Sequence, residues 1–288
     1  NYLAKLRADL DTATGQLNYD FSAEMLAYRS ASRVVLSAMG SRFFDSLEGY
    51  IRLSGASDGC ADDLQTLLPT GKGQADGIKV YSKGGMLSRD LQTAISFDRR
   101  ELHFDGIYAT GLDGVASGIF FYSKPEDQKG TYGGFFRVRD VNLASLMAAL
   151  GAEKPRTGRL STTIRFSRQS GDPSSMYGDA LVYLDNANIA DVPVLSQIVG
   201  FVGGANPFSF SDAIATFRMD GNVLTFSVAR ISTGITAVEF EEGAKLDIAN
   251  KQVSAHALVI PVDKLRNFLL RVPIVRLFVR LQDQITRL

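Results

Sequence analysis

The chain has 288 residues, and its 31 Lys and Arg residues balance its 31 Asp and Glu residues, so the formal net charge is zero. A nucleic-acid-binding protein usually shows a basic excess or stripe, which is missing over most of this length, so no nucleic acid is expected as a partner. Cys60 is the only cysteine, which excludes an intrachain disulfide. No apolar run reaches the ~18 residues of a membrane-spanning helix.

The first third of the chain gives mixed signals. Residues 2–10 have the pattern of a short helix, and neither an initiator Met nor a signal peptide precedes them, so we expect a piece of a longer polypeptide. Residues 16–55 fit either helix or strand. The alternation of Phe21, Ala23 and Met25 favours strands there.

Strands dominate the middle of the chain. A short helix is predicted at 62–68, before Pro69, and the glycine-rich stretch 71–77 is interpreted as a flexible loop because it lacks the spacing of a phosphate-binding loop. The predicted strands are 79–81, 91–108, 115–122, 134–138, 160–166 and 179–184.

Two further short helices are predicted between these strands. Asp140 or Asn142 caps the first, which ends at Gly151, and Asp191 caps the second, which covers 191–202. The apolar stripe of the first helix consists of Leu143, Leu146, Met147 and Leu150.

Three predicted hairpins place apolar residues on one face. Their turns lie at Arg99 and Arg100, at Asp220 and Gly221, and at Asn250 and Lys251. Because side chains alternate along a strand, each hairpin has an apolar and a polar side. The apolar positions are Ile95, Phe97, Leu102 and Phe104; Phe217, Met219, Leu224, Phe226 and Val228; and Leu246, Ile248 and Val253.

The second hairpin also predicts a register. Asp-Gly is a strong signal for a two-residue turn, because the tight turn needs positive φ. Such a turn pairs Phe217 with Leu224, Ala215 with Phe226 and Ala213 with Val228.

The order of these elements sets the expected fold. Strand runs are punctuated by short helices, without the strict alternation of a parallel α/β protein. We expect a mainly β protein with short helices (α+β): a long, curved antiparallel sheet with one apolar face, capped by short amphipathic helices. No internal boundary is visible, so residues 1–288 are expected to form one elongated region, with 263–288 as a C-terminal amphipathic helical segment.

Catalytic and metal-binding patterns are missing from the sequence. His103 and His256 are the only histidines, and both fall on polar faces of predicted hairpins, where a solvated side chain is expected. No Gly-x-Ser-x-Gly motif is present to support a serine nucleophile. We therefore expect no catalytic residue, no metal and no cofactor, and a protein that is not an enzyme.

Residues 130–151 carry a family resemblance. The glycine-rich strand at 130–134 is followed by Asp140-Val-Asn-Leu-Ala-Ser-Leu146, and 188–195 and 259–274 extend the likeness downstream. This pattern resembles the AsmA-like family of bacterial envelope proteins. The resemblance implies a periplasmic protein anchored in the inner membrane by a segment outside this chain. It implies a non-catalytic role in lipid transport and outer-membrane homeostasis, with inner- and outer-membrane proteins as partners.

Two functions follow from this combination. In the first, the apolar face is a groove for phospholipid or another acyl-chain lipid, although the same face can also be an ordinary packed core. In the second, the protein is a scaffold or outer-membrane protein assembly factor that binds protein segments by strand addition. A lipid groove is favoured because of the resemblance.

The C-terminal segment is basic and amphipathic, with Pro273 expected to break it into two helical pieces. One interpretation is a helix that caps the open end of the sheet. The other is contact with an anionic membrane surface. The membrane-contact candidates are Arg271, Arg276, Phe278 and Arg280.

Overall fold

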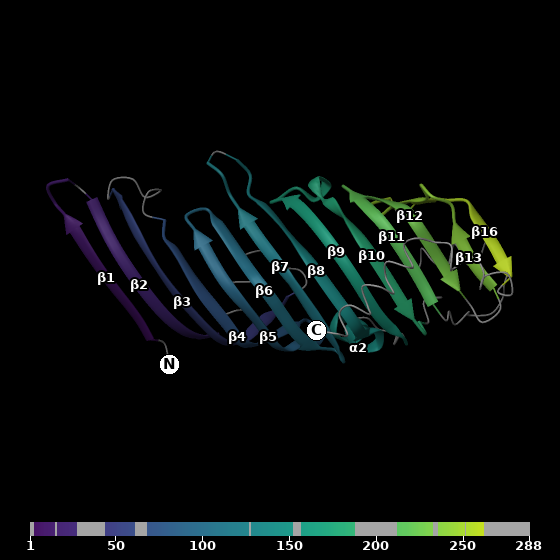
Figure 1. Ribbon diagram of the computed structural model, residues 1–288, viewed down its shortest axis with the longest axis horizontal. Coiled ribbons are helices and arrows are strands. Elements are labelled where there is room, and N and C mark those ends of the chain that lie inside the picture. The colour runs from purple at the N-terminus through teal and green to yellow at the C-terminus, as the bar shows by residue number, and fades with distance from the viewer. Residues whose placement is uncertain are drawn as a thin grey trace, which may run out of the picture.

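The computed structural model describes residues 3–14, 16–27, 44–60, 68–126, 128–151, 157–187, 212–232, 236–250 and 252–261. These residues form a mainly β structure, a long antiparallel sheet of 16 strands that does not close on itself (Figure 1). One short α-helix, α2 (Leu143–Ala149), and a 3₁₀ turn (Pro173–Ser175) accompany the sheet within these ranges.

The strands follow one another across the sheet in chain order from β1 to β13, and β16 lies beside β13. β14 pairs with β12 and with β15. The bounds are β1 Leu3–Asp11, β2 Gln16–Ala27, β3 Ser46–Cys60, β4 Thr70–Ser82, β5 Gly85–Asp98, β6 Glu101–Gly111, β7 Gly114–Ser123, β8 Thr131–Asn142, β9 Arg159–Gln169, β10 Tyr177–Asp185, β11 Asp212–Asp220, β12 Val223–Ser232, β13 Thr236–Phe240, β14 Lys245–Asp247, β15 Gln252–Ser254 and β16 Ala257–Pro261.

Period-two alternation explains the strands. In β2, Leu17, Tyr19 and Phe21 are partly buried, whereas the intervening Asn18 and Asp20 are exposed. A strand of this pattern presents one apolar and one polar face, so neighbouring strands pair with their apolar faces on the same side.

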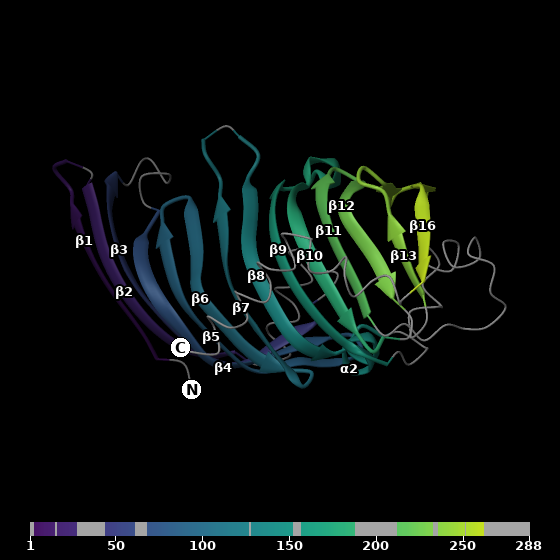
Figure 2. The same ribbon diagram turned by 45° about the vertical axis from the view of Figure 1, so that its right-hand side comes forward.

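The strands bend along their length, as Figure 2 shows most clearly for β4 to β8. Register shifts interrupt the β3–β4, β4–β5, β5–β6, β6–β7 and β8–β9 pairings. Four of these irregularities contain a residue with positive φ: Gly49 at 153°, Gly77 and Gly106 at 60°, and Asp140 at 56°. A β-bulge kinks its strand and increases the local twist, so bulges in adjacent strands bend the sheet.

α2 connects two distant parts of the sheet at its lower edge in Figure 2. Asn142 caps the helix, because its side chain accepts a hydrogen bond from the Ser145 amide at 3.0 Å. At the other end, the Gly84 amide of the β4–β5 turn donates to the Ala149 carbonyl at 2.9 Å, and the Ser82 hydroxyl donates to the same oxygen. The helix that follows β8 is thus tied to a hairpin several strands away.

The buried apolar residues form two clusters. The first cluster lies on β4 and β5 and consists of Ala75, Ile78, Val80 and Ile95. The second cluster joins α2 to the last strands and consists of Leu143, Ala187, Ile231, Val238, Phe240 and Ala244.

Two predictions about local structure are wrong. Residues 3–11 form β1 rather than a helix, because pairing with β2 overrides helix propensity. The glycine-rich 71–77 is part of β4 rather than a loop. At Gly71 a Cβ atom would lie 2.5 Å from the Phe97 ring, so glycine here is needed for close approach within the sheet.

The hairpins match the predictions to different degrees. The Arg99–Arg100 hairpin is confirmed, with Phe97 opposite Leu102. The next predicted register is wrong, because the tight turn is at Gly221 and Asn222. The observed pairs are Met219 with Leu224, Phe217 with Phe226, Thr216 with Val228, Ala215 with Ala229 and Ala213 with Ile231.

The third hairpin has a longer loop than the two residues predicted. Leu246 pairs with Val253 and Asp247 with Gln252, so Ile248, Ala249 and Asn250 belong to the connection and not to the strands. The helix predicted at 140–151 is confirmed, with Asn142 as its cap. The helices predicted at 62–68 and 191–202, and the segment 263–288, lie largely or wholly outside the described residues.

Candidate functional site

The most extended feature of the molecule is a continuous apolar face of the sheet. Its continuity can be followed from strand to strand, because directly opposite residues in paired strands share a face. One such row crosses the sheet from β1 to β15. It runs through Ala4, Ala23, Leu53, Gly73, Ile95, Phe104, Phe120, Gly134, Phe166, Gly178, Met219, Leu224, Leu246 and Val253. None of these residues is charged.

Aromatic rings line the middle of this face. The ring centroids of Phe104 and Phe120 lie 6.0 Å apart, those of Phe120 and Tyr132 6.2 Å, and those of Tyr132 and Phe166 6.5 Å. Phe136 continues the series at 6.3 Å from Phe166. These separations are typical of favourable aromatic pairs. We call these five residues the aromatic row; all five are partly buried.

Glycines let the rings lie close to the backbone of the neighbouring strand. Gly134 is directly opposite Phe120 and Phe166. A Cβ atom at Gly134 would lie 2.8 Å from the Phe136 ring, too close for contact without movement. Phe97 covers Gly71 in the same way, so the rings cover the sheet surface beside them.

Arg168 brings a charge to this face. The register places it at the upper end of β9, opposite Tyr132. The Arg168 Nε donates to the Asp172 carbonyl at 3.1 Å. The Ser174 hydroxyl and amide hold the pKa of Asp172 below its ordinary value, with smaller contributions from Lys129 and Arg168. Two cationic side chains, Arg168 and Lys129, therefore lie near this end of the apolar face, together with the Asp172 carboxylate.

The opposite face carries most of the charges, and we call it the charged face. Exposed ion pairs join Arg52 to Glu24 at 3.6 Å and Lys79 to Glu48 at 3.3 Å. Such exposed pairs are screened by solvent and contribute little to stability. Tyr183 donates to the Asp212 carboxylate at 3.1 Å, and burial, followed by the nearby Asp212, raises the pKa of Tyr183 to about 12.

The structure brings most of the predicted groove residues onto the apolar face. Ile95 is buried in the first cluster, at 7% exposure, and Phe97, Leu102 and Phe104 pack against that cluster. Phe226 packs against the second cluster. Some of these candidates are therefore part of the packed core and not simply exposed lining.

The remaining candidates fall into three groups. Phe217, Met219, Leu224, Leu246 and Val253 share the apolar face. Two other candidates do not lie on the apolar face as predicted. Val228 is opposite Thr216 on the charged face, because of the bulge in β12. Ile248 lies after the end of β14 and is 54% exposed. The membrane-contact candidates Arg271, Arg276, Phe278 and Arg280 lie outside the described residues.

Sequence reasoning missed the aromatic row beyond Phe104, and it missed Arg168. A signal is present, because Phe120 and Tyr122 alternate in β7 and Gly134 and Phe136 alternate in β8. The connections between these strands hide the register that brings the rings together.

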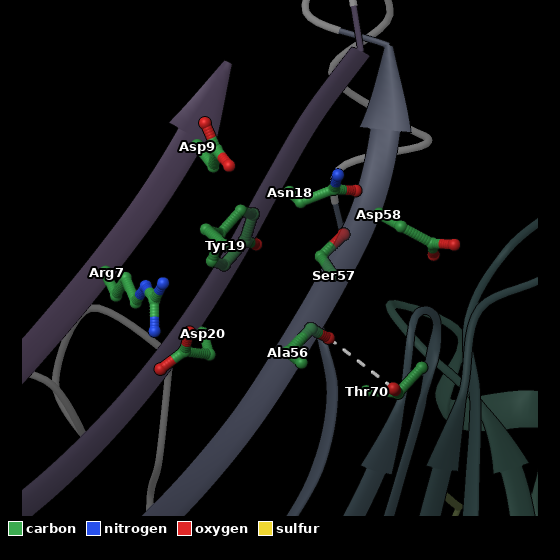
Figure 3. A pocket seen from close by; sticks show the side chains of 9 residues that line it. All are labelled: Arg7, Asp9, Asn18, Tyr19, Asp20, Ala56, Ser57, Asp58 and Thr70. Atoms are coloured by element: carbon green, nitrogen blue, oxygen red, sulfur yellow. Dashed lines mark hydrogen bonds between the residues drawn. The ribbon is translucent and has the colours of Figure 1, made fainter. Parts of the chain in front are cut away.

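A shallow, solvent-open hollow lies on the charged face over β1 to β4 (Figure 3). Arg7, Asp9, Asp20 and Asp58 surround it, and the Thr70 hydroxyl donates to the Ala56 carbonyl at 3.5 Å. Its acidic side chains are solvated and converge on no common point, so it defines no chemical site.

The described residues can also be searched for a histidine site, a metal site and a membrane-spanning helix. His103 lies on the charged face, 42% exposed and 3.4 Å from Glu101. No group of three metal-ligating side chains occurs within the described ranges. In the same part of the chain, no helix has both the length and the apolar character needed to cross a bilayer.

Comparisons with protein families, with curated proteins and with solved structures found no match. The resemblance to the AsmA-like family therefore stays a prediction from the motifs at 130–151 and downstream.

Proposed function

We propose that the protein is a non-catalytic component of the bacterial cell envelope that carries phospholipid, or another acyl-chain lipid, on the apolar face of its curved sheet. The observation that carries the proposal is the uncharged row of residues that crosses the sheet from β1 to β15. The aromatic row in its centre is only partly buried, so the rings have surface left for a ligand.

The physical basis is the hydrophobic effect. Removing apolar surface from water contributes ~25 cal/mol per Å², so covering one acyl chain is worth several kcal/mol. A bent sheet with one apolar side forms a gutter that shields the chains, while the headgroup stays at the edge in water. Arg168, at the upper end of this face, suits the phosphate of such a headgroup.

The cellular setting follows from the resemblance to the AsmA-like family. The protein is placed in the periplasm, anchored in the inner membrane by a segment outside this chain and associated with membrane proteins of both membranes. Its role there is lipid transport or outer-membrane homeostasis, without a cofactor.

The first test is the content of the purified protein. Lipid extraction followed by mass spectrometry should recover phospholipid in a fixed ratio to protein after the detergent-free purification of the full chain. Protein that folds, elutes as one species and carries no lipid would contradict the proposal.

A matched pair of variants tests the face. Phe136 and Phe135 are neighbours on β8, but Phe136 is opposite Ile164 on the apolar face and Phe135 is opposite Arg165 on the charged face. Phe136→Asp should remove most of the bound lipid, and Phe135→Asp should leave it. Thermal unfolding of both variants, measured beside the lipid content, separates loss of ligand from loss of fold; equal lipid loss in two folded variants would exclude the apolar face as the binding surface.

The alternative, a scaffold that binds protein segments, is favoured by one observation. The described sheet is open, so β1 and β16 end it with strand edges that no described strand covers. Strand addition at such an edge is a known mode of peptide binding. A scaffold should be isolated free of lipid and should retain its peptide partners when Phe136 is changed to Asp.

A further inference from the structure

β1 is an edge strand of the described sheet, with one side unpaired. It pairs with β2 on one side only, and no other described strand lies on its outer side. Every described side chain from Ala4 to Asp11 is exposed, including Leu6 at 72% and Leu10 at 49%. Unpaired backbone N–H and C=O groups along such an edge form a template for another strand.

The sequence of β1 is self-complementary when read in the two directions. Residues 5–11 read Lys-Leu-Arg-Ala-Asp-Leu-Asp, with two cations before Ala8 and two acids after it. Lys5, Arg7, Asp9 and Asp11 share the charged face, because their partners on β2 are alternate residues from Ser22 to Gln16. Leu6, Ala8 and Leu10 share the apolar face with Phe21, Tyr19 and Leu17.

We propose that two copies of this chain associate through their β1 strands, antiparallel and centred on Ala8. In that register Arg7 of each copy is opposite Asp9 of the other, and Lys5 is opposite Asp11. On the other face Leu6 is opposite Leu10, and Ala8 is opposite Ala8. The pairing is the same seen from either copy, as a two-fold symmetric interface requires.

Charge selects this register over its neighbours. The neighbouring registers that keep the apolar residues on one face move the centre of the pairing by one residue, to Arg7 or to Asp9. Centring the pair on Arg7 places Arg7 opposite Arg7, and centring it on Asp9 places Asp9 opposite Asp9. Like charges directly opposite one another are destabilising, whereas opposite charges stabilise a cross-strand pair.

The other end of the sheet is a poorer partner for β1. β16 is five residues, Ala257–Pro261, without a charged side chain, and its proline lacks a backbone donor. A head-to-tail contact of β1 with β16 would leave Lys5, Arg7, Asp9 and Asp11 without counterparts. The charges of β1 therefore favour a second β1, which offers opposite charges, over an uncharged strand, which offers none.

The β1 interface is independent of any ligand on the apolar face, because only the edge strand forms it. It has a consequence for that face, however. Because Leu6, Ala8 and Leu10 meet their equivalents, the apolar faces of the two sheets join into one surface of twice the length.

Charge exchange tests the register. Sedimentation or light scattering should show a dimer of the wild-type chain. Arg7→Asp and Asp9→Arg, each alone, turn two attractive pairs into repulsive ones and should weaken dimerisation by about tenfold or more. A mixture of the two variants should restore the dimer, because positions 7 and 9 are both acidic in the first variant and both basic in the second. Opposite charges then face each other only in the mixed pair.

Several outcomes would overturn the proposal. The first is a monomeric wild-type chain, in which the β1 edge is free or covered by another segment. The second is a dimer that neither substitution weakens. The third is a pair of variants that stay monomeric when they are mixed. Circular dichroism of each variant shows whether the fold survives, since Arg7 is also opposite Asp20 within the chain.

A disulfide crosslink tests the register of the β1 pairing independently of charge. Opposite residues of antiparallel strands have Cα atoms ~4.5–5.5 Å apart, within disulfide range. In a Cys60→Ser background, Ala8→Cys should form an interchain disulfide under mild oxidation. Ala4→Cys, on the same face but opposite Thr12, should not. Equal crosslinking of the two variants would contradict the register centred on Ala8.

Discussion

Arg165 and Arg168 lie three residues apart on β9 and face opposite sides of the sheet. Arg165 is opposite Phe135 and Asp179 on the charged face, whereas Arg168 is opposite Tyr132. The same residue type thus has two environments that only the register distinguishes. Such pairs provide internal controls for any function assigned to one face.

The first residue-scale prediction uses this pair. If Arg168 holds lipid phosphate, Arg168→Glu should reduce the retained anionic phospholipid several-fold, because attraction is replaced by repulsion. Arg165→Glu, with the same change of charge, should retain the wild-type amount. Quantitative lipid extraction from both variants measures the effect. Equal amounts of lipid in the two variants would show that Arg168 makes no headgroup contact.

The second residue-scale prediction concerns Tyr183. Its folded-state pKa is raised from 10.0 to about 12, so the folded state favours the neutral phenol. The stabilisation is complete below about pH 10 and is lost as the pH rises from 10 to about 12. The effect should stay under about 1 kcal/mol, since the side chain is only partly buried and solvent screens the interaction. Urea unfolding across this range should show a smaller loss for Tyr183→Phe than for wild type, and parallel curves would contradict the assignment.

At the scale of elements, the sequence predicts what local chemistry determines. The Arg99–Arg100 hairpin is correct because a short turn and strict alternation leave one register. The cap at Asn142 is correct because its acceptor reaches the Ser145 amide. The helix predicted in place of β1 is wrong because apolar residues there also fit helical spacing, and the partner that decides, β2, lies across a turn. The bulge in β12 has no local signal, so the predicted face of Val228 is wrong as well.

One element-scale prediction concerns the cap of α2. Asn142→Ala should lower the free energy of unfolding by about 0.5–2 kcal/mol, because the Ser145 amide loses its acceptor. Asn142→Asp keeps an acceptor and should cost much less. Denaturant unfolding of the two variants provides the comparison. Equal losses would show that the side-chain hydrogen bond does not stabilise the helix.

At the scale of the molecule, the amino-acid pattern predicts an open, mainly β sheet with an apolar side but not how far it continues. Each strand contacts chiefly its neighbours in the sheet, and α2 adds contacts with β5 and β8. The continuous row from Ala4 to Val253 results from many strand pairings. Each pairing has to place apolar residues on the same face of the sheet as the pairing before it. No single hairpin contains that information, so the aromatic row emerges only when the strands are assembled.

This nearly one-dimensional arrangement leads to a prediction about cooperativity. The first and second clusters are separated by β6 to β9, and proteins whose elements contact only their neighbours unfold locally, one part at a time.

Ile95→Ala should lower the free energy of unfolding by about 2–5 kcal/mol, and Val238→Ala should lower it by about 2 kcal/mol. Hydrogen exchange followed by mass spectrometry, in low denaturant, should then show faster exchange in β4–β6 for Ile95→Ala and in β11–β13 for Val238→Ala. The hydrogen bonds from the β4–β5 turn to the Ala149 carbonyl link the two regions in addition to the strand pairing, so Ser82→Ala should make the two responses more independent. Equal acceleration at both ends by either core substitution would instead show that the sheet unfolds as a single unit.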